Sequence, residues 1–103
     1  MSTEFINTKP SYFNLEKQEA LGNIAIYKRL INWVKSEFDL SLMDESDKLK
    51  VYIPNGCFGI WNFKNEDDIH IIKIKVECKS KVICATIMNQ LEGIYNHARD
   101  FEN

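Results

Sequence analysis

The side chains best suited to chemistry in this sequence are two histidines and three cysteines. His70 and His97 are the only histidines, and either could act as a base or bind a metal if a carboxylate such as Asp68 or Asp100 lay beside it. A metal or general-base site needs several converging groups, and the spacing of these histidines matches no helical His-x-x-x-His pair. We therefore expect two ordinary surface or half-buried histidines, with no metal and no cofactor.

The cysteines, Cys57, Cys78 and Cys84, form no Cys-x-x-Cys pair, and their odd number predicts reduced thiols rather than a disulfide framework. Cys84 is the best candidate nucleophile because it follows Lys79 and Lys81 near the start of an expected helix, where positive potential would lower its pKa. Its apolar neighbours instead favour a buried, inert thiol. A small thiol or histidine enzyme is accordingly the last of three functional hypotheses, and we expect no enzyme.

The chain as a whole has the composition of one globular domain. It has 103 residues, 45% of them hydrophobic and 27% charged, which suffices for one core but not for two. No run approaches the roughly 18 apolar residues of a membrane-spanning helix, and the first ten residues contain no cationic stretch followed by an apolar run. We expect a cytoplasmic protein with an N-terminal arm (residues 1–13) and a single α+β domain (residues 14–103).

The clearest structural pattern lies in residues 67–78, DDIHIIKIKVEC. From position 72 onward apolar residues alternate with charged ones, which predicts a strand with one buried and one solvent-exposed face. Residues 48–53 alternate in the same way and precede a Pro-Asn-Gly turn. Residues 57–64 are rich in aromatic side chains and predict the strand between them, although its inward face could be that of Phe58 or that of Trp61. Together these segments predict a three-stranded antiparallel meander.

Two helices are expected to flank this meander. Asn14 is the predicted N-cap of the first, whose apolar residues recur every three or four positions as far as Phe38. Ser80 is the predicted N-cap of the second, which carries a similar stripe as far as Phe101. The expected order is α-β-β-β-α, with both helices packed on the apolar face of the sheet. The predicted core contains Ile31, Val34, Val51, Ile74, Val76, Ile87 and Leu91.

Acidic residues provide the leading functional hypothesis. In the expected meander, the loop over residues 39–47 and the turn over residues 65–68 lie at the same end of the sheet. If both helices run antiparallel to their neighbouring strands, their C-termini reach that end and add negative potential. The acidic side chains would then form one pole. Those expected to bind a partner there are Glu37, Asp39, Asp44, Glu45, Asp47, Glu66, Asp67 and Asp68.

An acidic pole of this kind would steer the protein onto a basic partner, because complementary electrostatic fields accelerate association. We therefore expect a non-enzymatic protein-binding module, such as an immunity protein, an antitoxin or a phage-encoded inhibitor. Its partner would be a basic protein that handles nucleic acid, for example a nuclease toxin.

The exposed face of the predicted sheet supports the alternative hypothesis, nucleic-acid binding. This face would display four lysines, with Tyr52 and, if it faces outward, Trp61 as platforms for base stacking. Because like charges opposite one another destabilise a sheet, we expect the lysines to be interleaved with Glu77 and loop carboxylates, or with acidic groups of a homodimer partner. The four lysines are Lys48, Lys50, Lys73 and Lys75.

Overall fold

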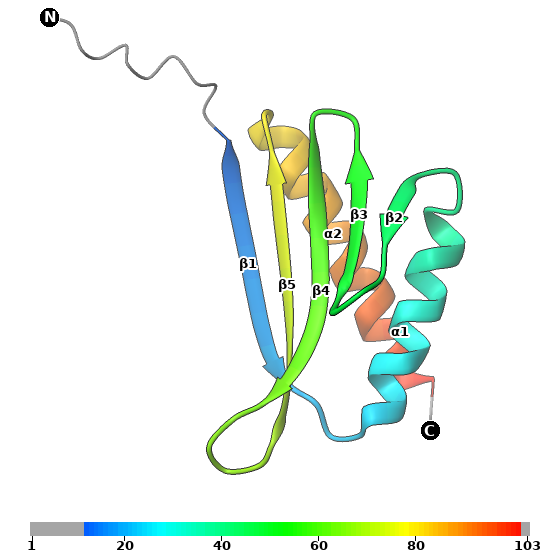
Figure 1. The fold of residues 1–103 in the computed structure, drawn as a ribbon, viewed down its shortest axis with the longest axis vertical. Helices are drawn as coiled ribbons and strands as arrows, with labels where there is room; N and C mark the ends of the chain where they lie inside the picture. The colour runs from blue at the N-terminus through cyan, green and yellow to red at the C-terminus, as the bar shows by residue number, and fades with distance from the viewer. Residues whose placement is uncertain (1–11, 102–103) are drawn as a thin grey trace, which may run out of the picture.

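The structure is a computed structural model that describes residues 12–101. This part of the chain contains five strands and two helices (Figure 1). Most of the expected N-terminal arm, residues 1–11, lies outside the described residues. The elements are β1 (Phe13–Ala20), α1 (Ile24–Glu37), β2 (Leu42–Asp44), β3 (Leu49–Ile53), β4 (Gly56–Lys64), β5 (His70–Cys78) and α2 (Lys81–Asp100).

All five strands belong to one antiparallel sheet, in the order β1-β5-β4-β3-β2. The expected meander is present as β3, β4 and β5, which form the centre of this sheet. The α+β class is confirmed. The expected element order is only partly matched, because the sheet gains one strand at each edge.

β1 occupies residues that the sequence pattern assigned to the first helix. Asn14, the predicted N-cap, is extended, and all eight residues of β1 pair antiparallel with β5. The helix begins later, at Ile24, where the side chain of Asn23 accepts a hydrogen bond of 2.8 Å from the backbone N–H of Ala25. The backbone groups of β1 pair with those along one edge of β5. This pairing stabilises the segment as a strand more than its helix propensity would stabilise it as a helix.

β2 is a short edge strand where a solvated loop was expected. It pairs antiparallel with β3, and Met43 lies opposite Val51. Met43 packs against the core, whereas Leu42 is exposed, so the segment alternates between the two faces of the sheet. A strand of three residues leaves few free backbone groups at this edge for pairing with another chain.

The two faces of the sheet differ in what covers them. Directly opposed residues of neighbouring strands project from the same face, and Phe58 lies opposite both Val51 and Val76. The helices cover this face: α2 runs behind the sheet in Figure 1, and the ring of Phe38 stacks edge-on against that of Phe58, with centroids 5.0 Å apart. The inward residues of β4 are therefore Phe58 and Ile60, and Trp61 faces outward.

The hydrophobic core lies between this face and the helices. Six of the seven residues predicted for it are buried, and Ile87 is partly buried against the same cluster. The predicted N-cap of α2 is also confirmed, because Oγ of Ser80 accepts a hydrogen bond of 3.2 Å from the backbone N–H of Ile83. Neither α1 nor α2 combines the length and the apolar content that a membrane-spanning helix requires.

The two helices run antiparallel to each other. Near the start of α1, Nη1 of Arg29 donates a hydrogen bond of 2.6 Å to the carbonyl oxygen of Ala98, near the end of α2. The backbone N–H of Leu21 donates to the carbonyl oxygen of His70 at 2.8 Å. The start of α1, the end of α2 and the start of β5 therefore lie at the end of the molecule that carries the β4–β5 turn, which we call the hairpin end (Figure 1).

Candidate functional site on the open face of the sheet

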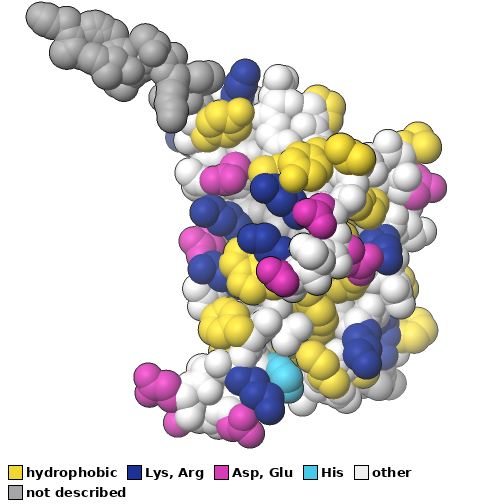
Figure 2. Space-filling view, viewed as in Figure 1, with side chains coloured by type: hydrophobic (Ala, Val, Ile, Leu, Met, Phe, Trp, Pro, Cys, Tyr) yellow, Lys and Arg dark blue, Asp and Glu magenta, His cyan; other side chains and the backbone are white. Residues whose placement is uncertain are grey.

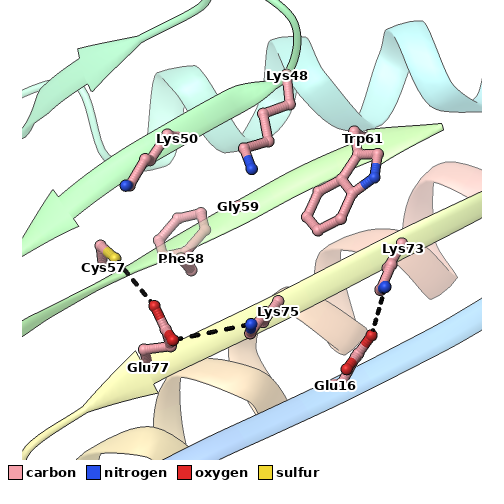
Figure 3. Close-up of a pocket in the computed structure, with 10 residues that line it drawn as sticks. All are labelled: Glu16, Lys48, Lys50, Cys57, Phe58, Gly59, Trp61, Lys73, Lys75 and Glu77. Carbon is pink, nitrogen blue, oxygen red and sulfur yellow. Dashed lines mark hydrogen bonds and ion pairs between the residues drawn. The ribbon is translucent and has the colours of Figure 1, made fainter. Parts of the chain in front are cut away.

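The face of the sheet that the helices leave uncovered, which we call the open face, carries most of the candidate binding residues. Lysines, carboxylates and apolar side chains are mixed on it, as Figure 2 shows. Its central part forms a hollow of about 280 Å³, whose lining residues are drawn in Figure 3. The lining residues on this face are Glu16, Lys48, Lys50, Cys57, Gly59, Trp61, Lys73, Lys75 and Glu77.

The strand register arranges these side chains in rows that run across the sheet. One row contains Glu16 on β1, Lys75 on β5, Gly59 on β4, Lys50 on β3 and Asp44 on β2. Two lysines thus flank a glycine, and a carboxylate stands at each end of the row. We call this arrangement the glycine row.

Trp61 lies in the next row along β4, and its ring lies beside Gly59. A Cβ atom at Gly59 would be only 3.4 Å from Cζ3 of Trp61, so the indole leans over the glycine. Two cations flank the ring, because Nζ of Lys48 lies 4.5 Å and Nζ of Lys73 lies 5.4 Å from its centroid. The hollow therefore combines an aromatic surface with converging positive charge.

Carboxylates pair with two of the four lysines, one closely and one loosely. Nζ of Lys73 lies 2.7 Å from Oε2 of Glu16, and Nζ of Lys75 lies 3.8 Å from Oε2 of Glu77. The expected interleaving of the lysines with Glu77 is confirmed, but the second carboxylate comes from β1 and not from a loop. The hydrogen bond from Lys73 holds the pKa of Glu16 below its usual value, so this carboxylate stays ionised at neutral pH.

The other two lysines contact aromatic rings. Lys48 lies against Trp61, as described above, and Nζ of Lys50 lies 5.3 Å from the centroid of Tyr52. Within residues 12–101, neither lysine forms an ion pair with a carboxylate. Their charges are accordingly available to an anionic ligand.

Two members of the open face, Glu16 and Gly59, were not expected from the sequence. Glu16 was assigned to the first helix, although the segment from Phe13 to Glu16 alternates apolar and polar residues, which is typical of a strand. A glycine inside a strand often marks a bulge or a place where a ligand or another backbone comes close, and this signal could have singled out Gly59.

The acidic residues expected to form one pole are separated in the structure. β1 carries the chain to the hairpin end before α1 begins, so α1 runs away from that end. Its last residue, Glu37, and the nearby Asp39 therefore lie towards the opposite end (Figure 1). The expectation of a single pole is wrong because it placed the C-termini of both helices beside the β4–β5 turn. Partner binding by these residues stays a prediction.

Three more of these carboxylates lie around β2 and the loop after it. Asp44 ends the glycine row opposite Lys50. Glu45 forms an ion pair with α1, with its Oε1 atom 2.9 Å from Nζ of Lys35. Asp47 lies between β2 and β3 and is exposed. β3 pairs only with the first part of β4, so this group is set back from the β4–β5 turn.

The remaining three carboxylates, Glu66, Asp67 and Asp68, stay together in the β4–β5 turn, which we call the acidic turn. All three are exposed. Oδ1 of Asn65 accepts a hydrogen bond of 2.9 Å from the backbone N–H of Asp67, and Asp68 adopts a φ of 64°, a conformation that aspartate tolerates well. Lys64 compensates part of the charge, with Nζ 3.3 Å from Oδ1 of Asp68.

The two histidines do not form the paired site that was considered from the sequence. The ring of His97 packs edge-on against Trp33, with centroids 5.4 Å apart. His70 lies at the start of β5, where its Nδ1 atom is buried and has no hydrogen-bond partner among the described residues. No group of three or more His, Cys, Asp or Glu side chains between residues 12 and 101 is placed to hold a metal ion.

Cys84 is not arranged as a nucleophile. It is 1% exposed, and its Sγ atom lies 3.5 Å from the carbonyl oxygens of both Phe13 and Val76, either of which can accept its one hydrogen. Burial raises its pKa, so the thiolate is disfavoured at neutral pH. Burial likewise raises the pKa of Cys57, which lies on the open face.

No protein-family model matches this sequence, and no curated protein matches it either. The open face and the acidic turn are the two candidate binding surfaces of the described residues.

Proposed function

We propose that this protein is a non-enzymatic binding module and that its open face binds single-stranded nucleic acid. The observation that carries the proposal is the partly buried indole of Trp61, which lies between the ammonium groups of Lys48 and Lys73 on the sheet face that neither described helix covers. Single-strand-binding proteins combine aromatic rings, on which bases stack, with cationic side chains that contact the phosphates. The open face offers both within one hollow.

An unpaired strand fits this face better than a duplex does. The flat face of an indole can stack only on a base whose own face is accessible, and in a duplex the neighbouring pairs cover the bases. The ammonium of Lys48 lies over the ring, so a stacking base displaces it. Because a lysine side chain is long and flexible, the displaced ammonium can move to the phosphate that accompanies the base. Binding then involves little movement of the sheet.

Trp61→Ala is expected to weaken binding of a fluorescein-labelled oligothymidylate by about 5- to 150-fold, because stacking contributes about 1–3 kcal/mol per base. Fluorescence anisotropy at about 50 mM salt, where phosphate contacts are strong, measures this difference. Trp33→Phe is the matched control, since Trp33 packs between α1 and α2 against His97 and Phe101 and is remote from the open face. Equal affinities of wild type and Trp61→Ala, or no binding by the wild type, would contradict the proposal.

A second candidate function is the protein-binding role, as an inhibitor, immunity protein or antitoxin that covers a basic nuclease. The acidic turn favours it, because three exposed carboxylates project at the end of a hairpin that extends beyond β3. Such a cluster would act mainly on the association rate, since exposed charges steer encounter more than they add affinity.

Reversal of Glu66 and Asp67 to lysine is expected to lower the association rate constant for a basic partner by about tenfold at low salt and to flatten its salt dependence. The fold should remain intact, because exposed turn substitutions change stability by about 0.5 kcal/mol or less. Asp68 is left unchanged because of its positive φ. The measurement is surface plasmon resonance against a basic protein captured from the source cells.

The matched control for this experiment is reversal of Lys73 and Lys75 to glutamate. It should leave association with the basic partner nearly unchanged and abolish oligothymidylate binding. The opposite pattern, in which only the lysine reversal slows association with the captured protein, would eliminate the protein-binding candidate.

A further inference from the structure

The glycine row has no side chain of its own at its centre and positive charge on both sides. Neighbouring strands in a sheet lie about 4.8 Å apart, so the backbones that carry Lys50 and Lys75 are separated by about 9.6 Å, with only Gly59 between them. Gly59 has no side chain to fill this gap. Both lysines line the same hollow, and Figure 3 shows their ammonium groups on either side of the glycine.

These two lysines are also more weakly held than Lys73. Lys50 contacts the ring of Tyr52 and forms no ion pair within the described part of the chain. The contact between Lys75 and Glu77 is long, at 3.8 Å, and both side chains are about two-fifths exposed, so it is weak. Lys73, in contrast, is held by Glu16 at 2.7 Å. Lys50 and Lys75 can therefore turn towards an anion without breaking a strong ion pair.

Crowding by the neighbouring backbone does not explain the glycine at position 59. A Cβ atom there would meet nothing closer than the side chain of Trp61, at 3.4 Å, and its φ is not in the left-handed region. Glycine in the interior of a strand weakens the sheet and often marks a place where a ligand comes close. Gly59 is itself buried, and the side chains of Trp61 and Lys48 lie over it, so glycine leaves room for these flexible side chains and, once they move, for a ligand.

We infer that the hollow over Gly59 is a phosphate site, in which one phosphodiester of a single-stranded nucleic acid lies between Lys50 and Lys75 while the adjacent base stacks on Trp61. This inference rests on the proposed function and adds the position of the strand on the sheet. Gly59 and Trp61 are two residues apart on β4, about 6.8 Å along the strand, which places the phosphate and the base in neighbouring rows. Glu16 and Asp44, at the ends of the glycine row, confine the positive potential to its centre.

Gly59→Asp and Gly59→Asn form the decisive pair of variants. Both side chains occupy the hollow and have nearly the same size, but only aspartate places a negative charge where the phosphate is inferred to lie. We expect Gly59→Asp to bind oligothymidylate at least about tenfold more weakly than Gly59→Asn, in fluorescence anisotropy at low salt. Equal affinities of the two folded variants would overturn the phosphate site.

The salt dependence of binding gives an independent measurement. Lys50→Gln and Lys75→Gln should each reduce the slope of log K against log salt by about 0.7, the value for one phosphate contact on a single strand. Lys28→Gln removes the same charge from an exposed position on α1, on the helix side, and should leave the slope unchanged. If Gly59→Asp fails to fold, the salt slopes of the lysine variants test the phosphate site instead. Unchanged slopes in both Lys50→Gln and Lys75→Gln would overturn the inference.

Two further outcomes separate this inference from the proposed function. Suppose that oligothymidylate binding depends on Trp61, but Gly59→Asp and Gly59→Asn bind equally and both lysine variants keep the wild-type salt slope. The phosphate site is then wrong and single-strand binding stands. If the wild type binds no oligothymidylate, both are wrong. Inorganic polyphosphate serves as the competitor, and competition as strong as that of unlabelled oligothymidylate, unaffected by Trp61→Ala, would indicate a general polyanion surface and overturn the inference.

Discussion

Ile74→Asp is expected to leave the protein unfolded at 25 °C. Ile74 is 2% exposed and lies in the middle of β5, paired on both sides by β1 and β4. Aspartate there either buries an unpaired charge or becomes protonated, and in both cases the protein loses several kcal/mol along with the apolar contacts of isoleucine. Since a domain of this size has a total stability of about 5–15 kcal/mol, the native state should not survive.

Circular dichroism and urea denaturation measure this effect, and Ile71→Asp is the control. Ile71 lies on the same strand but on the open face, opposite Ala20 and Phe63, and is only partly buried. The same change of side chain should therefore destabilise the protein far less at position 71. A cooperative unfolding transition for Ile74→Asp within about 1 kcal/mol of the wild type would contradict the core described above.

Gly56→Ala is expected to lower the free energy of unfolding by about 3 kcal/mol, because the added methyl group has no space. A Cβ atom at Gly56 would overlap the carbonyl oxygen of Glu77 and lie 2.8 Å from Cα of Cys78. Both atoms belong to the backbone of β5 and can move only if the pairing of β4 with β5 opens. For a domain of about 100 residues, such a loss lowers the melting temperature by at least about 12 °C.

Gly59→Ala is the matched control, because it makes the same substitution in the same strand. The methyl group at position 59 would make an ordinary contact with the flexible side chain of Trp61, so the expected loss is below about 1 kcal/mol. Differential scanning calorimetry can compare the two variants directly. Equal melting temperatures would show that the close approach at Gly56 relaxes without penalty.

The sequence predicts those helices and strands in which the spacing of apolar residues matches the side that is buried in the structure. β3 and β5 alternate strictly, and α2 carries a continuous apolar stripe after a good N-cap, so their type and inward faces follow from residue order. β1 is different, because its second half, Glu16–Ala20, consists of residues that favour helices in isolation. It is a strand only because β5, distant in sequence, offers it a pairing edge. β2 has only three residues, so its alternation of exposed and partly buried side chains does not distinguish it from a loop.

The assignment of β1 to the first helix also explains why the expectation of a single acidic pole is wrong. One additional strand before α1 reverses the direction of that helix, and this moves Glu37 and Asp39 away from the acidic turn. On the open face, the sequence predicts the lysines and one of their carboxylates, because they alternate along strands that were correctly assigned. It does not predict Glu16 or the glycine row, since rows across a sheet depend on the register between strands and not on the order of residues within one.

The pairing of β1 with β5 also constrains how the chain can fold during synthesis. Phe13 pairs with Cys78, so β1 leaves the ribosome roughly 3–13 s before the end of its partner, at translation rates of about 5–20 residues per second. During that interval the meander is incomplete and β1 has no partner. We expect the charges of Glu16, Lys17 and Glu19 to keep the unpaired segment soluble and to discourage its pairing with other nascent chains. The same charges that favour a helix in isolation thus protect a strand whose partner, β5, is the last strand of the sheet to be synthesised.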